Sequence, residues 1–244
     1  MPDRICSMTY VISDIHGRYF DLLDLLEKIN FTEQDTLYVL GDLVDRGPDS
    51  LLVLADLQER RNVHLLWGNH DFRMLAVLRD YRISSLADVE ALRKTDSRIE
   101  EWLQDGGMST LRDFCRMGRQ KDRNDIQGWL ENAFRLCDAV QVGGKAFFLA
   151  HTVPSKKKMQ NISACETEDF LYGEPEYDKR YFADCEIITG HTPTLMIDPA
   201  SRGKILHRNG HIAIDCGAYI TGVLGCLCLD TMEEYYIDCR RYSG

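Results

Sequence analysis

The sequence has 244 residues, of which 44% are hydrophobic, and its formal net charge is −10. This length and apolar content predict one large domain with a substantial core, and the acidic balance argues against wide contacts with nucleic acid. The sequence shows no run of about 18 apolar residues and no signal-peptide pattern, so we expect a cytoplasmic protein with no membrane contact. The nine cysteines are odd in number and form no CxxC pair, which argues against a disulfide framework or a zinc knuckle.

The first part of the chain alternates strand and helix patterns. Short apolar runs predict strands over residues 8–13, 36–40 and 63–67. Apolar residues at helical spacing predict helices over residues 20–29, 49–60 and 72–81. This order of elements is typical of a parallel sheet with helical crossovers.

Residues 82–135 differ in character from the first part, because they are rich in charge and show no clear strand. Helical patterns at 86–92, 99–103 and 108–117 predict a helical insertion or lid within a single domain spanning residues 1–244. Gly106-Gly107 is expected to separate two of its helices. We expect this insertion to cover one rim of the site, so that its deletion would change substrate choice more than metal binding.

The last part of the chain is rich in strand patterns. Two apolar runs at 139–142 and 146–150 flank Gly143-Gly144, which is a strong signal for a two-residue hairpin. Further strands are predicted at 187–189, 205–207, 212–215, 223–229 and 234–237. Together with the first part, these patterns predict an α/β fold of two packed sheets with helices outside.

Polar side chains follow five of the predicted strands, at the sheet edge where parallel strands carry active sites. They are Asp14 and His16, then Asp42, Asp45 and Arg46, then Asn69 and His70, and finally His151 and His191. Carboxylate, imidazole and amide groups are ligands of manganese, iron and zinc. One such cluster alone is more often a turn, but five in succession predict a metal site.

Three of these clusters resemble signature blocks of the PPP serine/threonine phosphoprotein phosphatases, which are calcineurin-like metallophosphoesterases. The likeness is greatest to small bacterial and phage members, and the blocks are also similar to those of symmetrical diadenosine tetraphosphate hydrolases. The blocks are Asp14-Ile15-His16-Gly17, Gly41-Asp42-Leu43-Val44-Asp45-Arg46-Gly47 and Gly68-Asn69-His70-Asp71. Later blocks are similar at His151, at Gly190-His191-Thr192-Pro193 and at Ile214-Asp215-Cys216-Gly217. The resemblance covers nearly the whole chain and implies an α/β/β/α sandwich of two mixed β-sheets flanked by helices, with a dinuclear metal centre.

The resemblance also implies a role for each residue. Asp14 and His16 would hold one metal ion, Asn69, His151 and His191 would hold the other, and Asp42 would bridge the two. These would be two divalent transition metal ions, with manganese favoured and iron or zinc as alternatives. A metal-bridging hydroxide would attack phosphorus in line. Arg46 would bind the phosphate oxygens, and His70, oriented by Asp45, would protonate the leaving oxygen.

Two departures from the family pattern concern the third and fourth blocks. Asp71 stands where phosphoprotein phosphatases usually carry Glu. Asp at this position is similar to the diadenosine tetraphosphate hydrolases, which often lack the acid found here as Asp45. His151 is followed by Thr152-Val153, whereas the family commonly has a small residue and then Gly.

A third departure concerns phosphate binding. Glu174 stands where the family usually carries a second phosphate-binding Arg. Arg180 or a lysine of residues 156–158 is a candidate substitute, unless the substrate or the register differs. Asp215 is expected to orient a ligating histidine rather than to bind metal, and His64, His207 and His211 are expected to be structural or exposed.

The sequence leaves three functions open. The first is hydrolysis of phosphoserine, phosphothreonine or phosphotyrosine in proteins, which the Asp45–His70 pair and Arg46 support. The second is symmetrical hydrolysis of dinucleoside polyphosphates such as diadenosine tetraphosphate, which Asp71 and the missing second Arg support. The third is a non-catalytic binding module, which the presence of all six expected metal ligands argues against. The expected partner is thus a phosphoprotein or a phosphorylated small molecule, and no oligomeric state is predicted.

Overall fold

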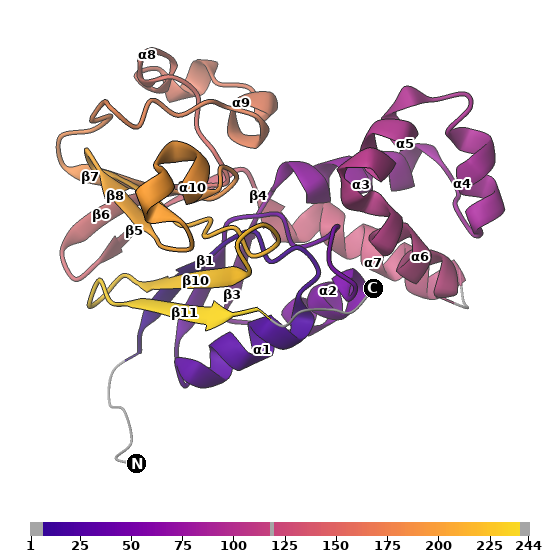
Figure 1. The fold of residues 1–244 in the computed structure, drawn as a ribbon, viewed down its shortest axis with the longest axis horizontal. Helices are drawn as coiled ribbons and strands as arrows, with labels where there is room; N and C mark the ends of the chain where they lie inside the picture. Colours follow the sequence, from indigo (N-terminus) through magenta and orange to yellow (C-terminus); the bar gives the residue numbers. More distant parts are fainter. Residues whose placement is uncertain (1–6, 118–119, 240–244) are drawn as a thin grey trace.

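The computed structural model describes residues 7–117 and 120–239, and its two β-sheets pack against each other between layers of helices (Figure 1). Both sheets contain parallel and antiparallel strand pairs. This arrangement confirms the predicted sandwich of two mixed sheets flanked by helices. Among the described residues, no helix is long and apolar enough to cross a membrane.

The first sheet has the strand order β11-β10-β1-β2-β3-β4. Its strands are β1 (Thr9–Ile12), β2 (Thr36–Val39), β3 (Val63–Leu66), β4 (Phe134–Arg135), β10 (Val223–Cys228) and β11 (Glu234–Asp238). β1, β2, β3 and β4 run parallel, as expected of strands joined by helical crossovers. The sequence did not predict β4, because two residues are too few to show a strand period.

The second sheet has the strand order β5-β6-β7-β9-β8. Its strands are β5 (Cys137–Val142), β6 (Lys145–Ala150), β7 (Cys185–Thr189), β8 (Leu206–Arg208) and β9 (His211–Ala213). The predicted hairpin between β5 and β6 is confirmed. Gly143 and Gly144 have φ angles of 57° and 80°, which a tight hairpin requires at both turn positions.

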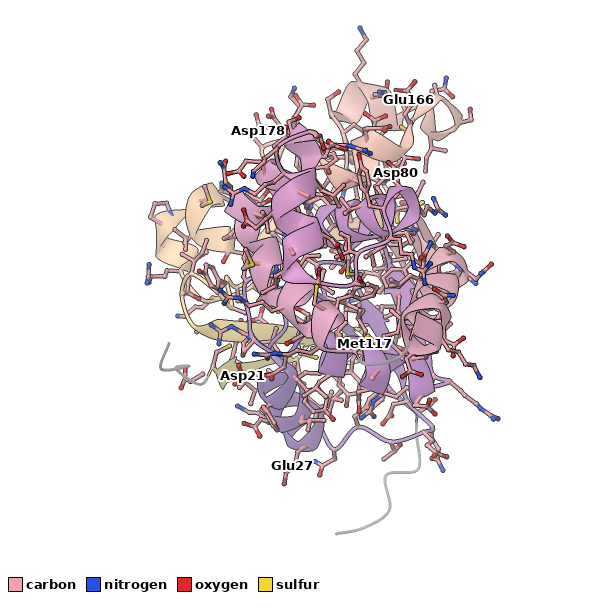
Figure 2. The ribbon with its side chains drawn as sticks, turned by 90° about the vertical axis from the view of Figure 1, so that its right-hand side faces the viewer. Asp21, Glu27, Asp80, Met117, Glu166 and Asp178 are labelled. Carbon is pink, nitrogen blue, oxygen red and sulfur yellow. The ribbon has the colours of Figure 1, made fainter. Side chains whose placement is uncertain are left out.

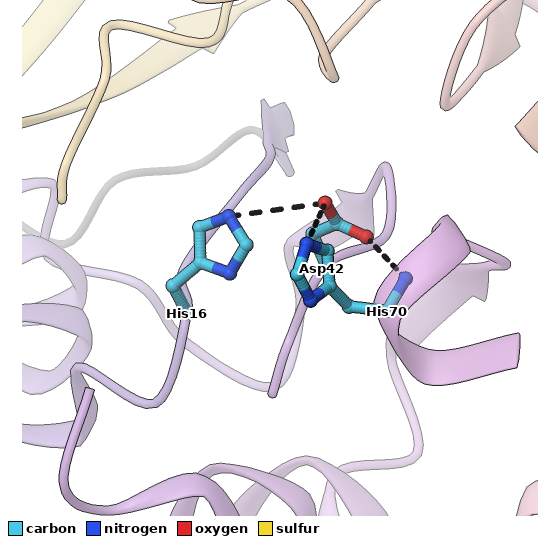
Figure 3. A group of neighbouring side chains, drawn as sticks. All are labelled: His16, Asp42 and His70. Carbon is cyan, nitrogen blue, oxygen red and sulfur yellow. Dashed lines mark hydrogen bonds and ion pairs between the residues drawn. The ribbon is translucent and has the colours of Figure 1, made fainter. Parts of the chain in front are cut away.

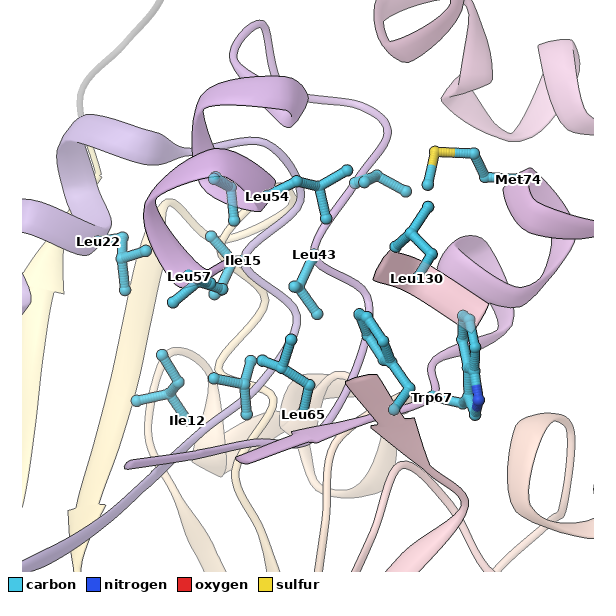
Figure 4. Packing of buried hydrophobic residues seen from close by; sticks show 14 of the residues in the cluster. Ile12, Ile15, Leu22, Leu43, Leu54, Leu57, Leu65, Trp67, Met74 and Leu130 are labelled. Carbon is cyan, nitrogen blue, oxygen red and sulfur yellow. The ribbon is translucent and has the colours of Figure 1, made fainter. Parts of the chain in front are cut away.

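Alternate side chains of the first sheet face two different cores, as the period of two in a strand dictates. In β1, Tyr10 and Ile12 pack with the helices, whereas Val11 packs with the second sheet. Figure 4 shows the helix-side core, where Ile12 and Leu65 of the sheet lie near helix residues such as Leu54. Among the eight cysteines that the structure describes there is no disulfide, and Cys6 lies outside the described residues.

Helices α1 (Tyr19–Lys28), α2 (Ser50–Glu59) and α3 (Asn69–Asp80) connect the strands of the first sheet. α3 begins three residues before the predicted start, because the Asp71 carboxylate accepts from the backbone N–H of Gly68 and caps the first turn. Asn69 and His70 therefore lie in the first turn of this helix. Short helices also follow the second sheet's strands: α8 (Lys156–Met159), α9 (Thr167–Leu171), α10 (Thr194–Ile197), and 3₁₀ turns Ile162–Ala164 and Pro199–Ser201.

The helical segment predicted as an insertion contains α4 (Leu86–Leu92), α5 (Ser97–Trp102), a π-helical turn (Leu103–Gly107), α6 (Met108–Arg116) and α7 (Gln120–Ala133). Gly106 has a φ of 103° and interrupts the helical path, as predicted for the Gly106-Gly107 pair. The outer face of the neighbouring helices carries many charged side chains, among them Asp80 at the end of α3 (Figure 2).

The helical insertion also shares its core with the first sheet. Trp102, Leu111 and Leu130 are fully buried in the same cluster as Ile12 and Leu65. Deleting residues 82–135 would therefore expose this cluster, and we now expect the deletion to unfold the protein. Point substitutions test the role of this segment better than its removal.

Candidate metal centre and active site

The five polar clusters lie just beyond the carboxyl ends of five parallel strands. β1, β2 and β3 end two or three residues before Asp14, Asp42 and Asn69, and β6 and β7 end directly before the clusters of His151 and His191. Because these strands run parallel within each sheet, their clusters meet at one edge of the sandwich.

The backbone of these clusters is strained. Nine non-glycine residues of the described chain have positive φ, and six of them are predicted site residues: Asp14, His16, Asp42, Asp45, Arg46 and His191. Their φ angles lie between 47° and 71°, a region that costs about 1–3 kcal/mol per residue and persists only where the surrounding structure holds it. Left-handed backbone turns aim these side chains into one space, and such strain is concentrated at functional sites.

Three donor atoms from different segments of the chain meet at one point of the site. The distances are 3.0 Å between His151 Nε2 and Asn69 Oδ1, 3.1 Å between His191 Nδ1 and Asn69 Oδ1, and 3.1 Å between the two histidine nitrogens. Asp42 Oδ1 lies 3.6 Å from His151 Nε2. These atoms are all electron-pair donors, so a cation among them would satisfy the whole group.

A second donor group lies on the other oxygen of Asp42 (Figure 3). Asp42 Oδ2 is 3.8 Å from His16 Nε2 and 3.9 Å from His70 Nε2. The ligand atoms of His16, Asp42 and His70 lie within 4.8 Å of one another, and the same holds for Asp42, His151 and His191. Asp42 is thus common to both groups.

Asp14 lies beside the donor groups without belonging to either. Its Oδ2 accepts a hydrogen bond of 3.0 Å from the backbone N–H of His191. Burial raises the pKa of Asp14 to about 6, with the charge of Asp42 adding to the rise and His151 opposing it. Two acids this close gain from a nearby cation, since the cation would offset their repulsion.

The histidines are held in the form that binds metal. Nδ1 of His16 lies 3.0 Å from the Val44 carbonyl and Nδ1 of His151 lies 2.7 Å from the Leu40 carbonyl. A carbonyl only accepts, so each Nδ1 carries the proton and each Nε2 presents a lone pair to the site. Burial lowers the pKa of His16 to about 3 and that of His191 to about 4, so both rings are neutral. Both the donor set and its protonation state fit a pair of divalent transition metals.

The partners of these rings differ from the expected ones. Backbone carbonyls orient His16 and His151, whereas the Asp215 carboxylate accepts a hydrogen bond from the backbone N–H of Gly217, at 2.8 Å. The prediction that Asp215 orients a ligating histidine is therefore replaced by a role in fixing the loop that follows β9.

His64, His207 and His211 stay outside both donor groups. They contact Tyr38, Glu234 and Thr189 respectively.

His70 and Asp45 form a buried pair at the side of the donor groups. His70 Nδ1 lies 2.8 Å from Asp45 Oδ2, and both side chains are almost fully buried. Burial and the neighbouring Arg46 oppose the charged ring, but Asp42 and Asp45 outweigh them and raise the pKa of His70 to about 9. The guanidinium N–H of Arg46, 2.9 Å from Nε2, can only donate, so Nε2 is an acceptor in this geometry and Arg46 must move away before the ring takes up its second proton. Bound dications would lower this pKa.

Residues of the helical insertion hold Asp45, and the sequence did not predict them. Trp102 Nε1–H donates to Asp45 Oδ2 at 2.7 Å, and the Thr110 hydroxyl donates to Asp45 Oδ1 at 2.6 Å. Ser50 Oγ accepts from the Asp45 backbone N–H at 3.0 Å. The orientation of Asp45 therefore depends on side chains that are 57 and 65 residues away in sequence.

Arg46 joins the two donor groups to the insertion. Its Nη1 donates to His16 Nε2 at 2.8 Å, and its Nη2 lies 2.9 Å from His70 Nε2 and 3.1 Å from Asp105 Oδ1. Asp105 Oδ2 in turn accepts from Arg73 Nη1 at 2.9 Å. The sequence showed no local pattern that marks Asp105 or Arg73 as part of this site.

The structure also explains the departures from the signature blocks. The Asp71 carboxylate accepts from the backbone N–H groups of Leu43 and Val44 at 2.9 Å and 3.3 Å, so it fixes the second block rather than touching metal. The Thr152 hydroxyl donates to the carbonyl of Gly173 at 2.9 Å, which ties the fourth block to the loop before Glu174.

Two of the expected substitutes for the second Arg, Arg180 and Lys158, have their cationic groups engaged elsewhere. Arg180 donates to the carbonyls of Phe182 and Ala183, and Lys158 pairs with Asp169. Arg73 instead brings a second guanidinium to the site.

Comparison with known proteins identifies the family of this chain. The family model described as calcineurin-like phosphoesterase matches residues 8–195 of this chain. The chain belongs to the calcineurin-like phosphoesterase family. This family consists of metal-dependent hydrolases with a dinuclear centre, in keeping with the two donor groups that share Asp42.

Curated relatives in the family match a short part of the chain. The symmetrical bis(5'-nucleosyl)-tetraphosphatase of Erwinia tasmaniensis is 52% identical over 71 residues, which cover 28% of this chain and 26% of that protein. The Salmonella typhimurium protein of the same name is 51% identical over 71 residues, covering 28% and 25%. The match thus spans about a quarter of the length of these relatives.

Solved structures match nearly the whole chain at low identity. A candidate diadenosine tetraphosphatase has a TM-score of 0.64 and 18% identity, covering 96% of this chain and 94% of that one. A protein serine/threonine phosphatase of Saccharomyces cerevisiae has a TM-score of 0.59 and 14% identity, covering 99% and 83%. At these identities the likeness shows the shared fold.

Proposed function

We propose that this phosphoesterase hydrolyses a phosphoric anhydride or ester at a dinuclear metal centre, with dinucleoside tetraphosphates as the first substrate candidate. The observation that carries the reaction is the position of Asp42 in both donor groups, because one shared carboxylate suits two cations held close together. When bound, two divalent metal ions polarise a phosphoryl group and acidify a shared water.

The residues divide into two ligand sets. We assign Asp14 and His16 to one ion and Asn69, His151 and His191 to the other, with Asp42 between them. Manganese is the favoured metal, and iron or zinc also suits this mixture of nitrogen and oxygen donors. His70 lies near Asp42 as well, but its hydrogen bond to Asp45 and its raised pKa suit a proton donor better than a ligand.

Substrate binding and proton transfer are assigned to the neighbours of the ligands. Arg46 binds the phosphate oxygens through its planar fork, and must leave His16 when that ring binds metal. His70 gives its proton to the leaving oxygen. Asp45 holds the ring in place and favours its charged form, which is the one that can donate.

Two exposed aromatic rings favour a nucleotide substrate. The ring of Tyr219 is 5.9 Å from the Arg46 guanidinium, and Tyr172 contacts Arg73. Both tyrosines are about half exposed, at 54% and 46%. Nucleobases stack on such rings and phosphates bind such guanidinium groups, so the pair suits a molecule that carries both. The sequence match to symmetrical bis(5'-nucleosyl)-tetraphosphatases supports the same assignment.

The second candidate is dephosphorylation of phosphoserine and phosphothreonine in proteins. The Asp45–His70 pair favours it, because a serine or threonine alkoxide is a poor leaving group that needs a proton, whereas a nucleotide leaves more easily. The fold likeness to the yeast protein phosphatase is compatible with this candidate.

A competition assay separates the two candidates. Manganese-loaded protein would meet a phosphoserine peptide and diadenosine tetraphosphate in one tube, with products separated by chromatography. We expect ADP to form faster than the dephosphorylated peptide. Peptide dephosphorylation with diadenosine tetraphosphate left intact would reverse the order of the candidates. An Asp42→Asn sample, expected to be inactive on both substrates, controls for contaminating phosphatases.

A further inference from the structure

The Asp105 carboxylate lies between two guanidinium groups and beside the His70 ring. Its oxygens are 3.1 Å from Arg46 Nη2, 2.9 Å from Arg73 Nη1 and 3.5 Å from His70 Nε2. Burial opposes its ionisation, but His70, Arg46 and Arg73 outweigh burial and lower the pKa of Asp105. A carboxylate held by two guanidinium groups makes the contacts that a phosphate group makes with the same groups.

The backbone around Asp105 fixes the carboxylate at this point. The Gly106 carbonyl accepts from the Arg46 backbone N–H at 3.0 Å, which joins the π-helical turn to the second block. Gly106 has a φ of 103°, and a Cβ there would lie 2.7 Å from Arg46 Cγ. The turn therefore approaches Arg46 as closely as a glycine allows. This close approach holds the Asp105 carboxylate next to the two guanidinium groups.

The position of Asp105 relative to the donor groups indicates which part of the substrate its carboxylate resembles. His70 Nε2 is 3.9 Å from Asp42 Oδ2 and 3.5 Å from Asp105 Oδ2, so the proton donor lies within reach of both carboxylates. The scissile phosphate is assigned to Asp42 and its metals. A second phosphate group, joined to the scissile one through the leaving oxygen that His70 protonates, would contact Arg46 and Arg73.

We propose that Arg46 and Arg73 form a subsite for the phosphate group adjacent to the scissile one, and that the Asp105 carboxylate fills this subsite until substrate displaces it. The inference rests on the proposed hydrolase function and narrows its substrate class to molecules with at least two contiguous phosphates. The leaving group would then be a nucleoside diphosphate or a similar diphosphate. Asp105 opposes ligand binding, because a ligand must replace the ion pairs of Asp105 with both Arg46 and Arg73. A singly charged group gains too little binding free energy to replace them.

Calorimetric titration of the manganese-loaded protein tests the subsite without relying on turnover. The probes are methylenediphosphonate, which carries two joined phosphonate groups and resists hydrolysis, and methylphosphonate, which carries one. The readout is the ratio of their dissociation constants in the wild type, Arg73→Gln and Asp105→Asn. Arg79→Gln is the matched control, since Arg79 lies on the same helix and pairs with Glu131 at the surface.

The subsite predicts opposite effects for the two variants. Arg73→Gln should reduce the preference for the diphosphonate by about 10-fold, which is the effect of a lost charge-assisted hydrogen bond. Asp105→Asn should tighten diphosphonate binding by about threefold or more, because the competing charge is gone. Arg79→Gln should leave both constants within about twofold of the wild type.

Three results would overturn the proposal. They are an unchanged preference in Arg73→Gln, weaker diphosphonate binding in Asp105→Asn, and a wild type that binds the two probes equally. Failure of the proposed function is a separate result: diadenosine tetraphosphate would stay intact in the competition assay whatever the probe ratio. Thermal unfolding shows whether Arg73→Gln or Asp105→Asn has lost its fold. If one of them has, the binding ratio of the other variant tests the proposal.

Discussion

Replacing Asp45 with Asn tests whether the buried pair makes His70 a proton donor. The substitution removes one negative charge next to the ring and keeps nearly the same side-chain volume. In the wild type the two carboxylates of Asp42 and Asp45 overcome burial and raise the pKa of His70 to about 9. With Asp45 neutral, burial and Arg46 are opposed by Asp42 and by the Asp105 carboxylate 3.5 Å from Nε2, and we expect the pKa of His70 to fall.

The same pKa sets a pH dependence of folding for the metal-free protein. The folded pKa of about 9 exceeds the ordinary value of 6.5, so protonation of His70 stabilises the fold. This contribution is fully present below pH 6.5 and is lost as the pH rises through about 9. A rise from 6.5 to about 9 corresponds to about 3 kcal/mol. In Asp45→Asn most of this dependence should vanish.

Two measurements on the metal-free protein check the reasoning. Nuclear magnetic resonance of labelled histidine rings gives the pKa of His70 directly, and urea unfolding between pH 6 and 9 gives the pH dependence of stability. Asp80→Asn is the control, because Asp80 pairs with Arg98 at the surface. A pKa of His70 that stays near 9 in Asp45→Asn would mean that Asp42 and Asp105 suffice to charge the ring, and the assigned role of Asp45 would be wrong.

Three further substitutions test other parts of the site. Trp102→Phe removes the indole hydrogen bond to the buried Asp45 carboxylate and should cost about 1.5–3 kcal/mol of stability, measured by urea unfolding. His151→Gln removes a donor from the group around Asn69 and should lower the metal content from two equivalents to one or none, measured by plasma mass spectrometry. Gly68→Ala places a Cβ 2.2 Å from the backbone N of Asp42, and should destabilise the protein by about 2 kcal/mol or more because the second block must move.

Each of these substitutions has a matched control in the described chain. Trp129→Phe changes a partly buried indole away from Asp45, and an equal loss of stability there would argue against the hydrogen bond. His207→Gln changes an exposed histidine and should keep two equivalents of metal. Gly128→Ala adds a Cβ that meets nothing within 4 Å in α7 and should be neutral or stabilising, so a similar cost there would refute the steric argument for Gly68.

The part of the site that the sequence predicted depends on local signals. Apolar runs marked β1, β2 and β3, and polar residues directly after them marked the clusters that meet at the sheet edge. A strand end fixes the position of the next two or three residues, so Asp14, Asp42 and Asn69 could be placed without knowing the tertiary structure. The start of α3 was missed by three residues, although Gly68 followed by Asp71 at the N3 position was a usable capping signal.

The part that the sequence did not predict depends on distant contacts. Asp105 lies 59 residues from Arg46 and 32 residues from Arg73, and the three meet only when the insertion packs on α3. No local period distinguishes a helix residue that faces a site from one that faces the core. The sequence around Trp102 shows the same apolar spacing whether the indole fills the core or donates a hydrogen bond to a carboxylate. In this structure the indole does both.

The insertion and the strained loops depend on each other. Asp45 and Arg46 both have positive φ, and this backbone strain persists only if neighbouring contacts hold it. Trp102 and the Gly106 carbonyl supply such contacts, one to the Asp45 carboxylate and one to the Arg46 backbone. Because Trp102 is buried in the main core, a change that disrupts this core would also disturb the orientation of the proton donor and of the phosphate-binding arginine. Variation in the insertion can therefore change the substrate subsite through Asp105, but it must preserve Trp102 and Gly106 if the catalytic pair is to keep its geometry.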